Sequence, residues 1–259
     1  MRAALEDIRV LELTRVGPGA FCTRMLGDMG ADVIKIEEPF REVEKWRRIA
    51  FDRNKKSIFL DLKLSEGQEV LHRLVSTGDV VVEGFRPGVN KRLGADYEML
   101  SNINPRIIYC SLSGYGQTGP YRDLPGHDLN YIAMAGVLDL IGERGGRPVI
   151  PLNLLADYAS ATLHGVIGIL MGIIAREKTG RGQCIDVSYT DGVMALIGSV
   201  PSVSEYLLSG RVPKRGEGLL GGLIPTITIM KQKMGAILPW VVLSITSGII
   251  CAVLWTVRI

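Results

Sequence analysis

The chain has 259 residues, of which 47% are hydrophobic and 22% charged, and its formal net charge is +3. This length and composition supply ample apolar sequence for a core, which excludes a disordered tail and predicts one large domain with a smaller second element. The small net charge gives no argument for nucleic-acid binding. The four cysteines are widely spaced, without a C-x-x-C pair or a histidine at metal-ligand spacing. They indicate neither a zinc site nor disulfides, and fit a reducing compartment.

The N-terminus, MRAALED, lacks the apolar core of a signal peptide and the acid-poor composition of a transit peptide. No peroxisomal tripeptide ends the chain. We therefore expect a cytoplasmic protein. The alternatives are membrane association through the C-terminal segment and, in a eukaryote, the peroxisome or the mitochondrion.

Hydrophobic periodicity predicts alternating strands and helices from the N-terminus onward. Residues 8–13 are typical of a buried strand, 17–19 of a turn, 20–29 of a helix closed by Gly30, and 32–37 of a second strand. The alternation continues at residues 57–62, 67–76, 80–83 and 107–112. This pattern predicts an α/β fold with a parallel sheet flanked by helices.

Two early segments have the composition of a phosphate site. Gly17 and Gly19, with Glu37, imitate a dinucleotide fingerprint, but Cys22 replaces the third glycine and Pro18 removes an N–H, so nicotinamide binding is not expected. The second segment is a basic run after the second strand, which is typical of a solvated face and also suits a polyphosphate or nucleotide tail. Its members are Arg41, Lys45, Arg47, Arg48, Arg53, Lys55 and Lys56.

Two further loops follow predicted strands, at the edge where α/β sheets bind ligands. Arg86 lies after the strand at 80–83 and could join the basic run. The glycine-rich segment 113–120, with Tyr115 and Gly116, lacks the Gly-Lys-Ser/Thr of a P-loop. A ligand-binding loop and an ordinary connection are equal alternatives for it.

The segments 126–131 and 151–157 hold an imidazole and a carboxylate, each with a polar neighbour that could orient it. His127 is followed by Asp128 and Asn130, and Asn153 lies one helical turn before Asp157. Chemistry beside a thioester carbonyl needs one group to take a proton, one to return it and donors for the enolate oxygen. Histidine titrates near neutrality, and a partly buried aspartate can be shifted toward it. A structural histidine and a helix N-cap are the alternative interpretations.

The segment after Asp157 predicts a buried helix that ends in a charged turn at 176–179 and Gly180. Asp157 is then in the first turn, where unpaired N–H groups can face an oxyanion. His164 lies about two turns deeper, and we interpret it as a packed core histidine.

Six segments, at residues 17–19, 26–37, 83–88, 113–120, 126–131 and 151–157, occur in one order along the chain. Together they resemble the class III CoA-transferase (CaiB/BaiF) family, most closely its α-methylacyl-CoA racemase branch. The likeness covers roughly residues 5 to 230.

The resemblance implies a Rossmann-like CoA-binding large domain, a small second domain and an interlocked homodimer. CoA enters as part of the substrate, so no separate cofactor, metal or nucleic acid is expected. In the racemase branch the residues matching His127 and Asp157 act as the two acid/bases on a 2-methylacyl-CoA. Asp128, Asn130 and Asn153 would support them, and the matching CoA-binding positions are Lys35, Leu60, Leu62, Arg86, Tyr115 and Gly116.

The transferase branch is the first alternative. There the aspartate matching Asp157 is a nucleophile that forms acyl anhydride and CoA thioester intermediates, and the paired histidine is generally absent. His127 therefore favours the racemase. The alternative of another class is a non-catalytic CoA-binding or membrane-anchored remnant.

Two departures from the family pattern stand out. Glu38 replaces an arginine often found after the second strand, so phosphate binding would depend on Lys35, Arg86 or the basic run. From about residue 226 the likeness stops. In the family, the missing portion contains a glutamate that supports the histidine, and it also contains the helices that complete the large domain. We therefore expect low or no turnover from this chain.

The C-terminal segment has two interpretations. Residues 235–257 carry no charge and are flanked by basic residues and tryptophans, which fits a membrane-spanning helix. We favour the other interpretation, a truncation or change of reading frame after about residue 225. The predicted domains are a large domain at 1–200, the start of an incomplete second domain at 201–230 and an apolar tail at 231–259.

Overall fold

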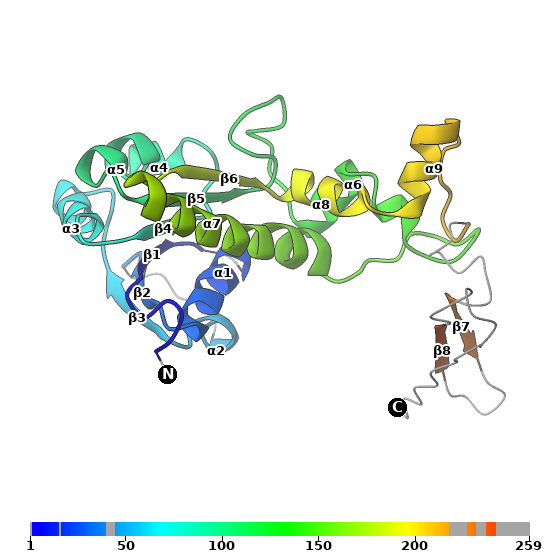
Figure 1. Ribbon diagram of the computed structural model, residues 1–259, viewed down its shortest axis with the longest axis horizontal. Helices are drawn as coiled ribbons and strands as arrows, with labels where there is room; N and C mark the ends of the chain where they lie inside the picture. The colour runs from blue at the N-terminus through cyan, green and yellow to red at the C-terminus, as the bar shows by residue number, and fades with distance from the viewer. Residues whose placement is uncertain (1, 16, 40–44, 218–226, 232–236, 242–259) are drawn as a thin grey trace. The chain divides into compact units, whose positions relative to one another are not determined.

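The computed structural model describes residues 2–15, 17–39 and 45–217, and the backbone of 227–231 and 237–241 (Figure 1). Two compact units are present. The sheet unit comprises Met1–Tyr131 and Asn153–Val193, and the second unit comprises Ile132–Leu152 and Met194–Ile259. Each unit is therefore built from two separate stretches of chain. The domain division at residues 200 and 230 stays a prediction.

The sheet unit contains six parallel strands in the order β3-β2-β1-β4-β5-β6. This is the strand order of a Rossmann fold and confirms the predicted class. The central strands β1, β4 and β5 are almost continuous runs of buried residues, as expected where helices cover both faces of a sheet. The strands are β1 (Arg9–Leu13), β2 (Asp32–Glu37), β3 (Lys55–Phe59), β4 (Val80–Glu83), β5 (Ile108–Ser113) and β6 (Cys184–Ser188).

Helices cover the two faces of this sheet (Figure 1). On one face Leu71 and Leu100 pack with Leu11 and Tyr109 in a buried cluster. On the other face Gly165 lets its helix approach the sheet closely, because a Cβ there would lie 3.1 Å from Leu112. The helices of this unit are α1 (Gly17–Asp28), α2 (Lys45–Phe51), α3 (Ser65–Val75), α4 (Val89–Arg92), α5 (Tyr97–Ile103) and α7 (Leu163–Thr179).

Two helices start in the sheet unit and continue into the second unit, namely α6 (Asp128–Met134) and α8 (Tyr189–Ile197). The second unit also contains a short 3₁₀ helix, η1 (Leu138–Leu140), and α9 (Pro201–Ser209). The strands β7 (Ile227–Lys231) and β8 (Ile237–Val241) form an antiparallel pair. A helix through all of 235–257 is therefore wrong at residues 237–241, and the rest of that segment lies outside the described residues.

The largest correction concerns the segment around Asp157. Residues Leu154–Thr162 form a π-helix, η2, and the α-helix α7 begins only at Leu163. The predicted turn at 17–19 is the first turn of α1, and the strand predicted at 57–62 is β3 at Lys55–Phe59. The edge strand β6 is half exposed, which weakens its hydrophobic signal.

Among the described residues, the stretch Leu154–Thr179 is long and apolar enough to cross a membrane by length and composition. Val166 and Ile169 of α7 are buried, and α7 packs on β5 and β6. A helix that packs on a sheet can have the same composition, so length and composition alone do not assign this stretch to a membrane.

Candidate active site

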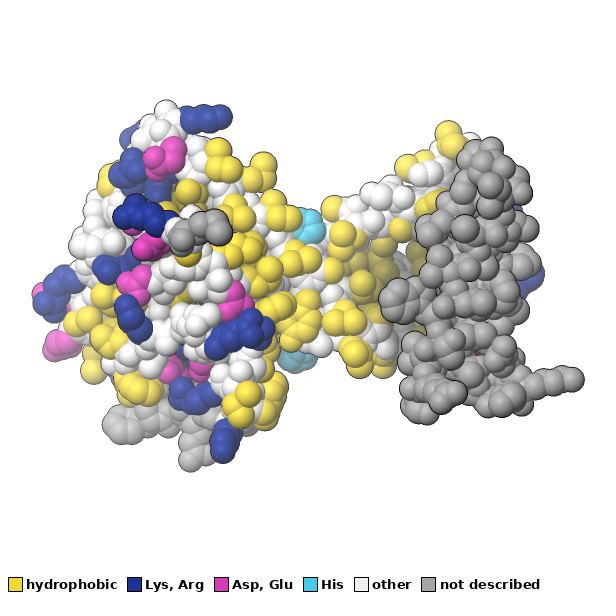
Figure 2. Space-filling model, turned by 60° about the horizontal axis from the view of Figure 1, so that its bottom comes forward, with side chains coloured by type: hydrophobic (Ala, Val, Ile, Leu, Met, Phe, Trp, Pro, Cys, Tyr) yellow, Lys and Arg dark blue, Asp and Glu magenta, His cyan; other side chains and the backbone are white. Residues whose placement is uncertain are grey.

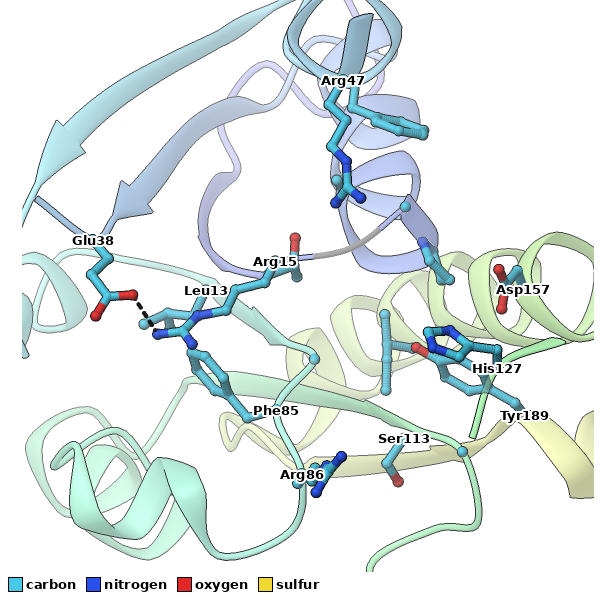
Figure 3. A pocket seen from close by; sticks show the side chains of 18 of the residues that line it. Leu13, Arg15, Glu38, Arg47, Phe85, Arg86, Ser113, His127, Asp157 and Tyr189 are labelled. Carbon is cyan, nitrogen blue, oxygen red and sulfur yellow. Dashed lines mark hydrogen bonds and ion pairs between the residues drawn. The ribbon is translucent and has the colours of Figure 1, made fainter. Parts of the chain in front are cut away.

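A cavity of about 930 Å³ opens at the carboxyl ends of the parallel strands. Its walls come from the residues that follow β1, β2, β4 and β5, the place where open α/β sheets bind ligands. Figure 3 shows His127, Asp157 and Tyr189 in one part of it and Arg15, Arg86 and Phe85 in another. The cavity therefore combines a part that can move protons with a part that carries positive charge.

His127 is fixed at the start of α6. Its backbone N–H donates to Asn130 Oδ1 at 3.0 Å, and the backbone N–H of Asn130 donates to the His127 carbonyl at 2.8 Å. This exchange resembles a capping box, in which the third helical residue bonds back to the N-cap. Asn130 thus holds the backbone of His127, whereas we expected it to orient the imidazole.

Tyrosines surround the segment that leads into His127. The Tyr131 hydroxyl donates to the Gly126 carbonyl at 2.6 Å, and a Cβ on Gly126 would lie 2.5 Å from the Tyr131 ring. Only glycine allows this approach. Tyr189 packs edge-on against Tyr131 at 5.2 Å between ring centroids. Burial raises the pKa of Tyr131 to about 12, so its phenol stays protonated at neutral pH.

Asp157 enters the cavity from η2, and Asn153 Nδ2 donates to Asp157 Oδ2 at 3.2 Å. This is the predicted support from one turn earlier. Burial raises the pKa of Asp157 above its usual range, and the nearby carboxylate of Asp128 raises it further. The bond from Asn153 and the charge of His127 act in the opposite direction. The net effect brings the carboxyl nearer to the range of a general acid or base.

Asp128 makes contacts that differ from the expected ones. It is buried, and its Oδ2 accepts the backbone N–H groups of Ala156 and Asp157, each at 2.9 Å. The sequence predicted that N–H groups near Asp157 hold the enolate oxygen. These two are not available for that role, because the Asp128 carboxylate already accepts their hydrogen bonds. Asp128 is also absent from the lining of the cavity.

Ion pairs use up most of the described basic run. Arg48 pairs with Glu37 at 3.2 Å and Lys56 with Asp32, and Lys35, which precedes the run, bonds to Asp52 at 2.9 Å. Arg53 pairs with Asp28, and Lys55 is buried against Glu12. Figure 2 shows basic and acidic side chains interspersed on the face of the molecule that it presents. Arg41 lies outside the described residues.

Arg86 differs from these cations. Its side chain lines the cavity and has no hydrogen bond or ion pair with any residue that the structure describes. Leu60 and Leu62, also predicted to contact CoA, line the same cavity, whereas Tyr115 and Gly116 do not. Arg86 is thus the cation best placed to meet a phosphate.

Sequence reasoning missed two cavity residues. Arg15 follows β1 directly, stacks over Phe85 at 5.3 Å and pairs with Glu38 at 3.0 Å. Arg122 donates to the Gln117 carbonyl at 2.9 Å and lines the cavity. The position of Arg15 after the first strand was a usable signal, because the ends of parallel strands share one edge. His164, interpreted as a core residue, bonds to the Ser160 carbonyl at 2.7 Å and is absent from the cavity lining.

Comparison with known proteins assigns the chain to a family. The model of CoA-transferase family III matches residues 5–255. The chain belongs to this family. The match extends beyond residue 225, where the likeness of the motifs ends. A structure of a CaiB/BaiF family protein from Brucella suis superposes with a TM-score of 0.82 at 35% identity, over 93% of this chain and 66% of that one.

Two curated relatives represent the two branches of CoA-transferase family III. Human α-methylacyl-CoA racemase is 44% identical over 74% of this chain and 50% of its own length. The succinyl-CoA–L-malate CoA-transferase beta subunit of Chloroflexus aurantiacus is 40% identical over 73% of this chain and 50% of its own length. The chain thus spans about half the length of these relatives, and the two branches match it almost equally well.

Proposed function

We propose that the chain binds an acyl-CoA thioester and exchanges its α-proton between His127 and Asp157, as a racemase of 2-methylacyl-CoA would. One observation carries the proposal: both side chains line the same cavity, and the charge of His127 acts on the Asp157 carboxyl. A two-base exchange needs a base and an acid that reach one carbon from different sides. Side chains in separate cavities would have ruled it out.

The chemistry balances without a cofactor. The basic member of the pair removes the α-proton and leaves a thioester enolate, and the acidic member returns a proton to the opposite face. The next turnover restores both groups by exchange with water or by reaction in reverse. The enolate oxygen needs donors other than the Ala156 and Asp157 N–H groups. In the first turn of α6 the Asn130 and Tyr131 N–H groups donate to the His127 carbonyl, which leaves those of Asp128 and Leu129 as candidates among the described residues.

The test is deuterium incorporation into a 2-methylacyl-CoA incubated with the 259-residue chain in deuterated water. We expect slow exchange above the rate without protein. His127→Ala and Asp157→Asn should each reduce it by about 100-fold or more, since each removes a proton-transfer group. His164→Ala is the matched control and should exchange like the wild type, because His164 lies outside the cavity lining. A wild type that binds CoA without any exchange would overturn the racemase proposal and leave CoA transfer and the non-catalytic alternative.

CoA transfer through Asp157 is the second candidate, and the 40% identity to a succinyl-CoA transferase favours it. In that reaction the Asp157 carboxylate attacks the thioester carbonyl, CoA leaves as a thiolate, and an aspartyl anhydride remains. Hydroxylamine would convert the anhydride to a hydroxamate on Asp157, which mass spectrometry detects. Such an adduct, together with transfer to a carboxylic acid and no α-exchange, would replace the racemase proposal.

A further inference from the structure

One buried carboxylate connects the two segments of the proposed active site. Asp128 follows His127 in the chain, and its Oδ2 accepts the N–H of Asp157 and that of the preceding Ala156. The acid/base candidates His127 and Asp157 are 30 positions apart in sequence. The Asp128 side chain alone bridges the backbone next to His127 and the backbone of Asp157. Movement of α6 relative to η2 would break both hydrogen bonds.

The link has a second property, its charge. Asp128 is 5% exposed, and its Oδ1 has no hydrogen-bond partner among the described residues. It is neither neutralised by a described ion pair nor in contact with the cavity. The ionisable groups that act on one another around Asp157 are Asp128, His127, Tyr131 and Tyr189. Asp128 is the other carboxylate in this set.

The two N–H groups that Asp128 accepts belong to the first part of the π-helix η2. A π-helix widens the turn and leaves the N–H groups of its first turn without intrahelical partners. In η2 the Asp128 carboxylate supplies the missing acceptor from another element, so it acts as an N-cap from outside the helix. The wide turn that presents Asp157 is therefore held by Asp128.

We propose that Asp128 is a positioning residue, which sets the place of Asp157 relative to His127 through its two hydrogen bonds and brings a second carboxylate close to the Asp157 carboxyl. This inference rests on the proposed function for its effect on catalysis. The effect on Asp157 itself does not depend on turnover. It can therefore be tested even in a chain that exchanges no protons.

Two variants separate the hydrogen bonds from the charge. Asp128→Asn keeps a carbonyl oxygen as acceptor and removes the charge, so the Asp157 pKa should fall while exchange at its optimum drops about tenfold or less. Asp128→Ala removes both, and exchange should drop about 100-fold because the reacting groups lose their alignment. The pKa is measured by carbon NMR of labelled aspartate carboxyls, with the Asp157 signal assigned from its absence in Asp157→Asn.

Asp96→Asn is the matched control. Asp96 also accepts a backbone N–H at the start of a helix, from Met99 at 3.2 Å, and is absent from the cavity lining. The control should leave the Asp157 titration and the exchange rate unchanged. An Asp128→Asn protein with the wild-type Asp157 titration would overturn the proposal, as would wild-type exchange in Asp128→Ala. A wild type without exchange would count against the proposed function alone, since the titration would still decide the role of Asp128.

Discussion

Glu83 shows how burial changes a carboxyl next to the cavity. It ends β4, is 1% exposed, and accepts the Ser111 hydroxyl and the Phe85 N–H, the latter at 2.8 Å. Burial raises its pKa to about 7, against the opposing effect of these two hydrogen bonds. Arg86 is the residue that follows Phe85. The ionisation of Glu83 therefore occurs beside the loop that carries Arg86, a cavity cation without an ion pair among the described residues.

We expect Glu83→Gln to become more stable than the wild type as the pH rises. Between pH 4.5 and about 7 the folded protein retains the Glu83 proton and the unfolded chain has lost it, so the wild type loses stability across this window. Glutamine cannot ionise. The free energy of unfolding of the variant, measured by urea denaturation, should gain about 2 to 3 kcal/mol on the wild type from pH 5 to pH 8. A pH-independent difference would show that Glu83 does not titrate in this range.

At the scale of elements, the class and order of the early strands could be predicted because their apolar runs are local signals. The predicted strands at 32–37 and 80–83 coincide with β2 and β4. The π-helix around Asp157 could not be predicted. Its first-turn acceptor is Asp128, a tertiary contact 29 positions away that no local pattern contains. The strand prediction at 57–62 found β3 but missed its first two residues, Lys55 and Lys56, which look alike in sequence.

The two lysines of β3 have different environments. The Lys55 side chain is 1% exposed and bonds to Glu12 at 2.7 Å. Glu12 is buried and also accepts hydrogen bonds from the hydroxyls of Thr14 and Thr23. Lys56 is 75% exposed and pairs with Asp32. The buried pair joins β3 to β1. Removal of one partner would leave a buried charge uncompensated.

Lys55→Met should lower the free energy of unfolding by about 3 to 5 kcal/mol, and the neighbouring control Lys56→Met by less than about 1 kcal/mol. The double variant Glu12→Gln/Lys55→Met should recover part of the loss, because it removes the unpaired charge. Urea denaturation of the three proteins measures these differences. Equal costs for the two lysines would mean that Lys55 is not buried against Glu12.

At the scale of the whole molecule, the site arises where the ends of several strands meet. His127, Asp157 and Arg86 could be assigned from residue type and position after predicted elements, and all three line the cavity. The pairing of Lys35 with Asp52 could not, because β2 and the end of α2 meet only in the folded sheet. A composition count treats each lysine as an available charge, whereas folding neutralises most of those in the basic run by ion pairs.

Because ion pairs neutralise most of the basic run, we expect Arg86 to contribute measurably to ligand binding. Arg86→Ala should weaken binding of CoA about tenfold, because it removes a charge-assisted bond to a phosphate. The loss should shrink in 1 M salt, where charges are screened within about 3 Å. Binding of pantetheine, which has no phosphate, should not change. Calorimetric titration of both ligands measures this, and Arg73→Ala, an exposed arginine on α3 outside the cavity, is the matched control. Equal losses for CoA and pantetheine would assign Arg86 a structural role, because a lost phosphate contact can weaken only the ligand that carries a phosphate.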